Sequence, residues 1–281
     1  MGTKLSGKDL AVQHKSEIKE LIASRVGKGK RPPRLVSIIV GEDGGSISYT
    51  RGQKKVSEEL GILYETKMFS ENISEDKLID EIKELNEDNS VDGIIIQLPL
   101  PKALNEERVL DAVDVEKDVD GLTDFNLGKM YKDKKSFMPC TARSVLELIK
   151  SQVDIKGKEA VIIGRSNIVG KPAAFLLLKE NATITICHSK TINIGSVCKK
   201  ADILVSAIGK PGFVTKDFVK EGAIVIDVGT TMVEGKVKGD VNFEEVLEVA
   251  SLVTPVPGGV GAMTTTMLMK NTCEAWLKNV Q

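Results

Sequence analysis

Apolar and polar positions along the first half of the chain follow the spacing of helices and short buried strands. Apolar residues at helical spacing predict a first helix over about residues 7–26. Apolar runs closed by turn signals then alternate with further helical patterns. The predicted strands are 35–40, 63–69 and 91–96, and the predicted helices between them are 48–60 and 75–86. Parallel strands joined by helices need right-handed crossovers, so this half predicts an α/β fold with a parallel sheet.

The second half repeats this rhythm. It opens with Pro139-Cys140-Thr141, where Thr141 is expected to cap a connecting helix over about 141–151. A long turn over 254–261 leads into a last predicted helix over about 264–277. In between, the predicted strands are 160–163, 183–187, 203–206 and 224–227, with helices from 170 and over about 192–199. The predicted fold class is therefore α/β, with two α/β domains and a Rossmann-type parallel sheet in the second.

Composition and charge narrow the class of protein. The 281 residues carry a formal net charge of −1, which favours neither a nucleic-acid partner nor an anionic membrane surface. The four cysteines lie far apart, which favours reduced thiols in a cytoplasmic protein and argues against zinc. With only two histidines, a histidine-based metal site or a Ser-His-Asp triad is hard to assemble, so we expect no metal. The chain also lacks an apolar stretch of membrane-spanning length and, at its start, the apolar core of a secretion signal.

A candidate ligand-binding side chain follows the third predicted strand. That strand runs into Gln97-Leu98-Pro99-Leu100-Pro101, and the two prolines cannot donate to a central ladder. The chain must leave the sheet there, which places Gln97 at the carboxyl end of the strand, where open α/β sheets bind ligands. An ordinary strand exit explains the same residues.

The first turn of the second half has the context of a dinucleotide-binding fingerprint. Gly164-Arg165-Ser166-Asn167-Ile168-Val169-Gly170 lies between a predicted strand and a predicted helix. It departs from G-x-G-x-x-G, because Ser166 replaces the middle glycine and Gly170 comes one residue late. Small residues still allow backbone N–H groups to approach a pyrophosphate, whose negative charge the helix dipole favours.

The end of the next strand favours NADP over NAD. NAD enzymes usually place Asp or Glu there to bind the ribose 2′-hydroxyl, whereas this chain has Cys187-His188-Ser189-Lys190. A hydroxyl and a cation suit a 2′-phosphate, and Arg165 is expected to reach it from the first turn. His188 either contacts the cofactor or is an ordinary packed or solvent-facing imidazole.

Several segments together resemble the methylenetetrahydrofolate dehydrogenase/methenyltetrahydrofolate cyclohydrolase family (FolD type). These segments are 92–101, 117–122, 139–141, 164–172, 188–191 and 254–261, and they span nearly the whole chain in the family's order. The resemblance implies a folate-binding domain, residues 1–120 plus 264–281, and an NADP-binding domain, residues 121–263, across a cleft. It also implies a homodimer formed through the cofactor domains and a role in the one-carbon metabolism that supplies purine biosynthesis.

The family resemblance also assigns roles to single residues. It implies oxidation of 5,10-methylenetetrahydrofolate, with Asp120 binding the pterin ring, Tyr49 packing along the folate and Gln97 at the site floor. Without the family, Asp120 would be interpreted as a turn residue and Tyr49 as a core aromatic. Further contacts are implied with the substrate for Pro257, Gly258 and Gly259, and with NADP for Ile168 and Thr230 beside the residues named above.

One departure from the family pattern concerns its second activity, hydrolysis of the methenyl product to 10-formyltetrahydrofolate. The family's Tyr-x-x-x-Lys-x-Lys pattern reads Tyr49-Thr50-Arg51-Gly52-Gln53-Lys54-Lys55 here, so Gln53 occupies the place of the catalytic lysine. Residues i and i+4 share a helix face, while Lys54 lies about 100° around the axis. Glutamine cannot exchange a proton near neutral pH, so we expect the cyclohydrolase to be weak or absent.

Two other interpretations fit part of the sequence. An NADP dehydrogenase for another small substrate, such as a shikimate-like or amino-acid compound, explains the second half but leaves Gln97 and Asp120 unexplained. A catalytically impaired dinucleotide-binding regulator would explain Gln53, but the cofactor turn and Asp120 argue against it.

Overall fold

The computed structural model describes residues 2–280 and contains two compact α/β units. The three-stranded unit comprises residues 13–140 and those from 265 on. The six-stranded unit comprises residues up to 12 together with 141–264. The predicted class, α/β with a parallel sheet in each half, is confirmed.

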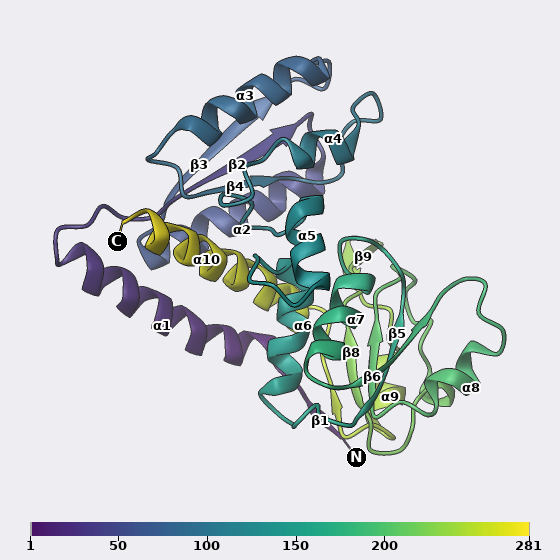
Figure 1. The fold of residues 1–281 in the computed structure, drawn as a ribbon. Coiled ribbons are helices and arrows are strands. Elements are labelled where there is room, and N and C mark those ends of the chain that lie inside the picture. The colour runs from purple at the N-terminus through teal and green to yellow at the C-terminus, as the bar shows by residue number, and fades with distance from the viewer. Residues whose placement is uncertain (1, 281) are drawn as a thin grey trace. The chain divides into compact units, whose positions relative to one another are not determined.

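The three-stranded unit has a parallel sheet in the order β3-β2-β4. Its strands are β2 (Arg34–Val40), β3 (Leu63–Phe69) and β4 (Gly93–Ile96). Helix α3 (Glu75–Glu87) lies on one face, and α2 (Gly44–Leu60) and α10 (Val260–Asn279) lie on the other (Figure 1). The α3 side is an apolar core that includes Val36, Ile38, Val40, Leu78, Ile82, Ile94 and Ile96.

The opposite face of this sheet carries polar groups. The buried positions of α2 are Ser46, Thr50, Gln53, Ser57 and Leu60, which recur at helical spacing. Four of these five side chains are polar, so this helix buries hydrogen-bonding groups where a core helix usually buries apolar ones. Gln53 finds its hydrogen-bond partners on or next to the sheet, whereas Ser57 donates to Met269 of α10 and Ser46 donates to Asp43 and the Leu98 carbonyl.

The six-stranded unit has a parallel sheet in the order β1-β11-β8-β7-β5-β6. Its strands are β1 (Thr3–Lys4), β5 (Glu159–Ile163), β6 (Thr183–Cys187), β7 (Ile203–Ser206), β8 (Ile224–Asp227) and β11 (Leu252–Val253). The chain leaves β5 for β6 on one side and then returns to β7 on the other. This reversal is the topological switch point, where doubly wound sheets bind their ligands. Helix α7 (Gly170–Lys179) connects β5 to β6.

Most predicted elements are present, with differences at their ends. Helix α1 (Gly7–Val26) and strands β3, β6, β7 and β8 have the predicted bounds. Thr141 is not an N-cap, because α6 (Cys140–Lys150) begins one residue earlier and contains it. The predicted last helix begins too late, since α10 starts at Val260. The predicted helix over 192–199 is present as the shorter α8 (Ile194–Cys198). The sequence did not predict several short elements: β1, β11, α4 (Glu106–Asp111), α5 (Asp124–Tyr131), α9 (Phe243–Leu247), and the hairpin of β9 (Thr231–Val233) and β10 (Lys236–Lys238).

The unit boundaries follow from strand pairing. Strand β1 pairs with β11, so the first residues belong to the six-stranded unit and not to the unit of the strands that follow them. Residues 121–140 belong to the three-stranded unit. No helix within residues 2–280 is long and apolar enough to cross a membrane.

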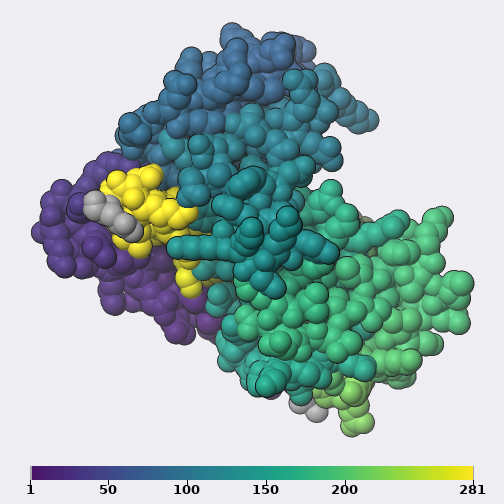
Figure 2. All heavy atoms as spheres, in the orientation of Figure 1, coloured from purple at the N-terminus to yellow at the C-terminus, as the bar shows by residue number. Residues whose placement is uncertain are grey.

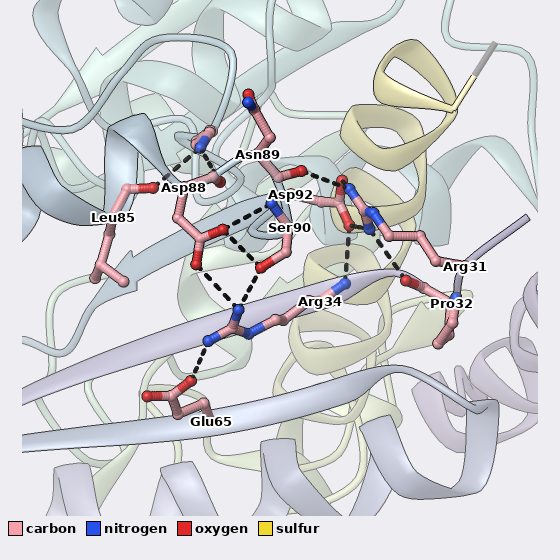
Figure 3. Close-up of polar contacts among 10 residues, drawn as sticks. Arg31, Pro32, Arg34, Glu65, Leu85, Asp88, Asn89, Ser90 and Asp92 are labelled. Carbon is pink, nitrogen blue, oxygen red and sulfur yellow. Dashed lines mark hydrogen bonds and ion pairs between the residues drawn. The ribbon is translucent and has the colours of Figure 1, made fainter.

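A polar cluster around Asp92 lies at the amino end of the three-stranded sheet (Figure 3) and also contacts α10 through two residues that the figure does not draw. The fully buried Asp92 carboxylate accepts two hydrogen bonds from Arg31, at 2.7 and 2.8 Å, and one from the backbone N–H of Arg34 at 2.9 Å. Asn279 on α10 donates to the same carboxylate at 2.9 Å, and the indole of Trp276 donates to the Arg31 carbonyl at 3.0 Å. In the space-filling view, the yellow end of α10 lies beside the purple first helix (Figure 2).

Replacement of Asp92 should strongly destabilise the protein. Asp92→Ala leaves Arg31 and a backbone N–H without their acceptor, and breaking a buried ion pair costs about 3–5 kcal/mol. The measurement is the free energy of unfolding in urea. The matched control is Asp80→Ala, which removes one partner of an ion pair exposed on both sides and should cost less than about 1 kcal/mol. If the two substitutions lowered the free energy of unfolding equally, the Asp92 cluster would not have the stabilising role given to it here.

Candidate functional site

The turn after β5 requires glycine at both ends. Gly164 has φ +123°, and a Cβ there would lie 2.4 Å from the Ala207 carbonyl oxygen. A Cβ on Gly170 would lie 2.4 Å from the carbonyl oxygen of Gly164. Side chains at either position would push the turn away from α7, so the two glycines hold the backbone at the helix N-terminus.

The side chains within this turn are exposed. Arg165, Ser166 and Ile168 face solvent, and the Ser166 hydroxyl accepts from the backbone N–H groups of Val169 and Gly170 at 3.2 and 3.3 Å. The first turn of α7 contains no acidic residue. A tight turn at a helix N-terminus without acidic residues fits the pyrophosphate of a dinucleotide, and Arg165 is an exposed cation in that turn.

The end of β6 presents a hydroxyl and a cation. Ser189 and Lys190 are exposed, and the Nδ1 atom of His188 accepts from the backbone N–H of Lys190 at 3.1 Å. The His188 backbone N–H donates to the Thr191 hydroxyl at 2.9 Å. His188 is therefore an ordered part of this turn, and the residues at the strand end fit a phosphate better than a ribose diol.

Two buried carboxylates shape the loops after β7 and β8. Asp240 accepts from the Ser206 hydroxyl at 3.0 Å and from the backbone N–H groups of Ile208 and Lys210 at 2.8 and 2.7 Å. Asp227 accepts from the backbone N–H groups of residues 229, 240 and 241. Burial, together with the charge of Asp240, raises the pKa of Asp227 to about 6. Sequence reasoning did not identify these two residues. The exposed Thr230 lies in the loop that they hold.

The polar face of α2 meets the sheet at Gln97. Gln97 follows β4, as predicted, and its Nε2 donates to the Ser37 hydroxyl at 2.9 Å and to Oε1 of Gln53 at 3.0 Å. The hydroxyl of Tyr64 on β3 donates to the same Gln53 oxygen at 2.7 Å. Gln53 is fully buried, and its Nε2 has no hydrogen-bond partner among residues 2–280. Lys54 is exposed, so it does not share the buried face of Gln53, which agrees with the predicted rotation around the helix axis.

Tyr49 and Asp120 lie near each other in the same unit. Burial and then the charge of Asp120 raise the pKa of the Tyr49 phenol well above its ordinary value. Burial and the charge of Asp118 raise the pKa of Asp120 to about 6, while hydrogen bonds from Cys140 act against this rise. Gln53 and Asp120 both act on the Tyr49 phenol, and Gln97 is hydrogen-bonded to Gln53, so the structure brings these four residues into one partly buried polar site. Sequence reasoning missed Tyr64 and Ser37, although both lie on predicted strands.

The turn predicted to contact substrate belongs to the six-stranded unit. Its Pro257 precedes Gly258, which has φ +105° and whose carbonyl oxygen accepts from the backbone N–H of Gly7 at 3.0 Å. A Cβ on Gly259 would lie 2.6 Å from the Pro255 carbonyl oxygen. The turn thus needs both glycines for its own conformation, whatever its ligand.

A dinucleotide-type sheet joined to a second α/β unit with its own polar site defines a two-domain dehydrogenase architecture. Two family profiles match the chain: "Tetrahydrofolate dehydrogenase/cyclohydrolase, catalytic domain" over residues 5–120, and the NAD(P)-binding domain of the same family over residues 139–280. The chain belongs to the tetrahydrofolate dehydrogenase/cyclohydrolase family. The family resemblance noted in the sequence is confirmed, as is its NAD(P)-binding domain.

Individual relatives are similar over their full length. The bifunctional protein FolD of Clostridium acetobutylicum is 58% identical over 98% of this chain and 99% of its own. The crystal structure of the bifunctional FolD enzyme from Campylobacter jejuni has a TM-score of 0.96 at 41% identity, covering 99% of each chain. The Trypanosoma brucei enzyme, solved with NADP and an inhibitor, has a TM-score of 0.94 at 37% identity, covering 100% of this chain and 99% of its own. Shikimate dehydrogenase from Aquifex aeolicus, with a TM-score of 0.54 at 14% identity over 86% of this chain and 91% of its own, shares the fold alone.

Proposed function

We propose that this protein oxidises 5,10-methylenetetrahydrofolate to 5,10-methenyltetrahydrofolate with NADP, and hydrolyses the methenyl product weakly or not at all. Family membership supports the first part. The observation that carries the second part is Gln53, which is fully buried in the site where the family pattern has a lysine. Its hydrogen-bond partners are the neutral side chains of Tyr64 and Gln97.

The oxidation step needs binding and orientation more than proton transfer. A hydride leaves the one-carbon bridge of the folate, and the two flanking nitrogens delocalise the positive charge that results. NADP, when bound, would supply the hydride acceptor, so this step requires no side chain to exchange a proton. In this proposal the Asp120 carboxylate accepts from pterin N–H groups, Tyr49 packs along the folate, and Gln97 orients it.

The proposed cofactor contacts divide by the chemistry of the ligand. Gly164, Ser166 and Gly170 hold the pyrophosphate at the N-terminus of α7. Arg165 and Ser189, with His188 beside them, bind the 2′-phosphate. In the same proposal, Ile168 and Thr230 also contact the cofactor, Thr230 at the nicotinamide end, and the substrate contacts the turn at Pro257, Gly258 and Gly259.

Hydrolysis of the methenyl product makes a different demand. Water must be activated and a proton must be released, which calls for a side chain that exchanges protons near neutral pH. The amide of Gln53 cannot do so. Lys54 is exposed and lies on another face of α2, so it does not replace the missing lysine. The homodimer that the resemblance implies and the cytoplasmic location that the cysteine spacing favours stay predictions.

Cofactor preference is the first measurement. With methylenetetrahydrofolate as substrate, kcat/KM for NADP should exceed that for NAD by at least about tenfold, the equivalent of one charge-assisted contact of about 1.4 kcal/mol. Arg165→Ala should reduce this preference while leaving kcat with NAD unchanged. Failure of the wild type to reduce either cofactor would refute the proposed function.

The second measurement concerns hydrolysis of methenyltetrahydrofolate. The wild type should add little to the uncatalysed rate, and Gln53→Lys should raise the enzymatic rate by about 10²-fold, the low end of general acid–base catalysis. Lys54→Gln is the matched control, because it removes a neighbouring exposed lysine and should change nothing. Rapid hydrolysis by the wild type, or its loss in Lys54→Gln, would contradict the role given to Gln53.

The pH dependence of folate binding should report Asp120. Its pKa is raised to about 6, so the carboxylate that accepts pterin N–H groups is lost as pH falls through 6. KM for methylenetetrahydrofolate should therefore rise about tenfold between pH 7.5 and pH 5, while KM for NADP stays level. In Asp120→Asn, KM should be higher but flat over that range. A wild-type KM that does not change below pH 6 would refute this role.

A further inference from the structure

The hydroxyl of Tyr64 is part of a chain of four side chains that come from different elements. Tyr64 lies on β3, Gln53 on α2, Ser37 on β2, and Gln97 follows β4. The strand register pairs Leu35 with Tyr64, so the Tyr64 and Ser37 side chains share the sheet face opposite the apolar core. The arrangement therefore belongs to the polar site and not to the core.

The donors and acceptors among these four side chains determine which group donates in each hydrogen bond. Burial raises the pKa of Tyr64 to about 12, so the phenol keeps its proton and donates to Oε1 of Gln53. Gln97 Nε2 has two hydrogens, and both are used, one toward Ser37 and one toward Gln53. The Gln53 oxygen then accepts two hydrogen bonds, which matches its two lone pairs.

This direction decides which atom of Gln97 is left for a ligand. Both N–H bonds of the Gln97 amide point toward Ser37 and Gln53. The amide atom that remains for a ligand is therefore Oε1, which is an acceptor. A lysine at position 53 has donors only and would face the inward N–H groups of Gln97, so it would favour the opposite orientation of that amide. The residue at position 53 thus sets the polarity of its neighbour as well as its own chemistry.

We propose that Tyr64 is a positioning residue of the folate site: through Gln53 it fixes the Gln97 amide so that Gln97 presents a hydrogen-bond acceptor to an N–H donor of the folate. The proposal rests on the proposed function in its choice of ligand. It adds a second reason for weak hydrolysis, because the site then directs an acceptor toward the folate where the opposite orientation of Gln97 would direct a donor.

The test is a double-mutant cycle read out in steady-state kinetics. Tyr64→Phe removes only the hydroxyl and should raise KM for methylenetetrahydrofolate three- to tenfold, with kcat within twofold and KM for NADP unchanged. Gln53→Met should raise KM at least as much, and the double variant should be no worse than Gln53→Met alone, since Tyr64 acts through Gln53. Ser24→Ala, which removes an exposed hydroxyl on α1, is the control and should have no effect. An unchanged KM in Tyr64→Phe, or effects that multiply in the double variant, would overturn the proposal.

A conservative variant at position 53 separates a positioning role from a packing role. It also tests the proposal if Tyr64→Phe does not fold. Gln53→Glu keeps an oxygen as the acceptor for Tyr64 and Gln97, so its KM should stay within threefold of the wild type while that of Gln53→Met rises. The reverse order would overturn the proposal. If the wild type does not oxidise methylenetetrahydrofolate, the proposed function fails by itself. The same variants are then compared by the Kd for tetrahydrofolate in calorimetry, where the same order supports the inference and its absence refutes it.

Discussion

Parallel pairing of strands is the constraint on which both halves of this protein depend. A parallel sheet needs a crossover after every strand. The carboxyl ends of all its strands therefore lie at the same end of the sheet, and the connections to the helices begin there. Gln97 follows β4, Gly164 follows β5, His188 follows β6 and Asp227 ends β8. The six-stranded unit therefore gathers its candidate side chains at the carboxyl ends of its strands, whereas the three-stranded unit adds side chains from α2 and β3 to Gln97.

The two units satisfy the hydrogen bonds of their buried polar groups in different ways. In the six-stranded unit, Asp227 and Asp240 accept mainly backbone N–H groups, so the loops that carry Thr230 are held by fixed main-chain geometry. In the three-stranded unit, side chains bind side chains from Ser37 to Tyr64, and one buried amide nitrogen, on Gln53, stays without a partner among the described residues. A buried donor of this kind is costly, and such costs concentrate where ligands act.

Local pattern was sufficient to predict the longer elements and the cofactor turn. Strands such as β7 and β8 are continuous apolar runs, and the glycines of the turn are read directly from spacing. Two-residue strands such as β1, and short helices such as α4, have too few residues for periodicity to show. Tyr64 was missed for another reason: its contact with Gln53 depends on the register of β3 against β2 and on the rotation of α2, which are tertiary properties. Position 53 was found only because the family pattern pointed to it.

The polar cluster at Asp92 has a consequence for the order in which the chain becomes structured during synthesis. The Asp92 carboxylate accepts from Asn279 and the Arg31 carbonyl accepts from Trp276, so both hydrogen bonds form only after the end of the chain has been made. Strand β4, the last strand of the sheet, is made more than 180 residues before Asn279. The three-stranded sheet therefore leaves the ribosome with α2 but not α10 on one face while residues 141–264 of the six-stranded unit are being translated. During that interval the nascent chain exposes strands β2 to β4 on the side that α10 later covers, which is the stage at which a chaperone has most to protect.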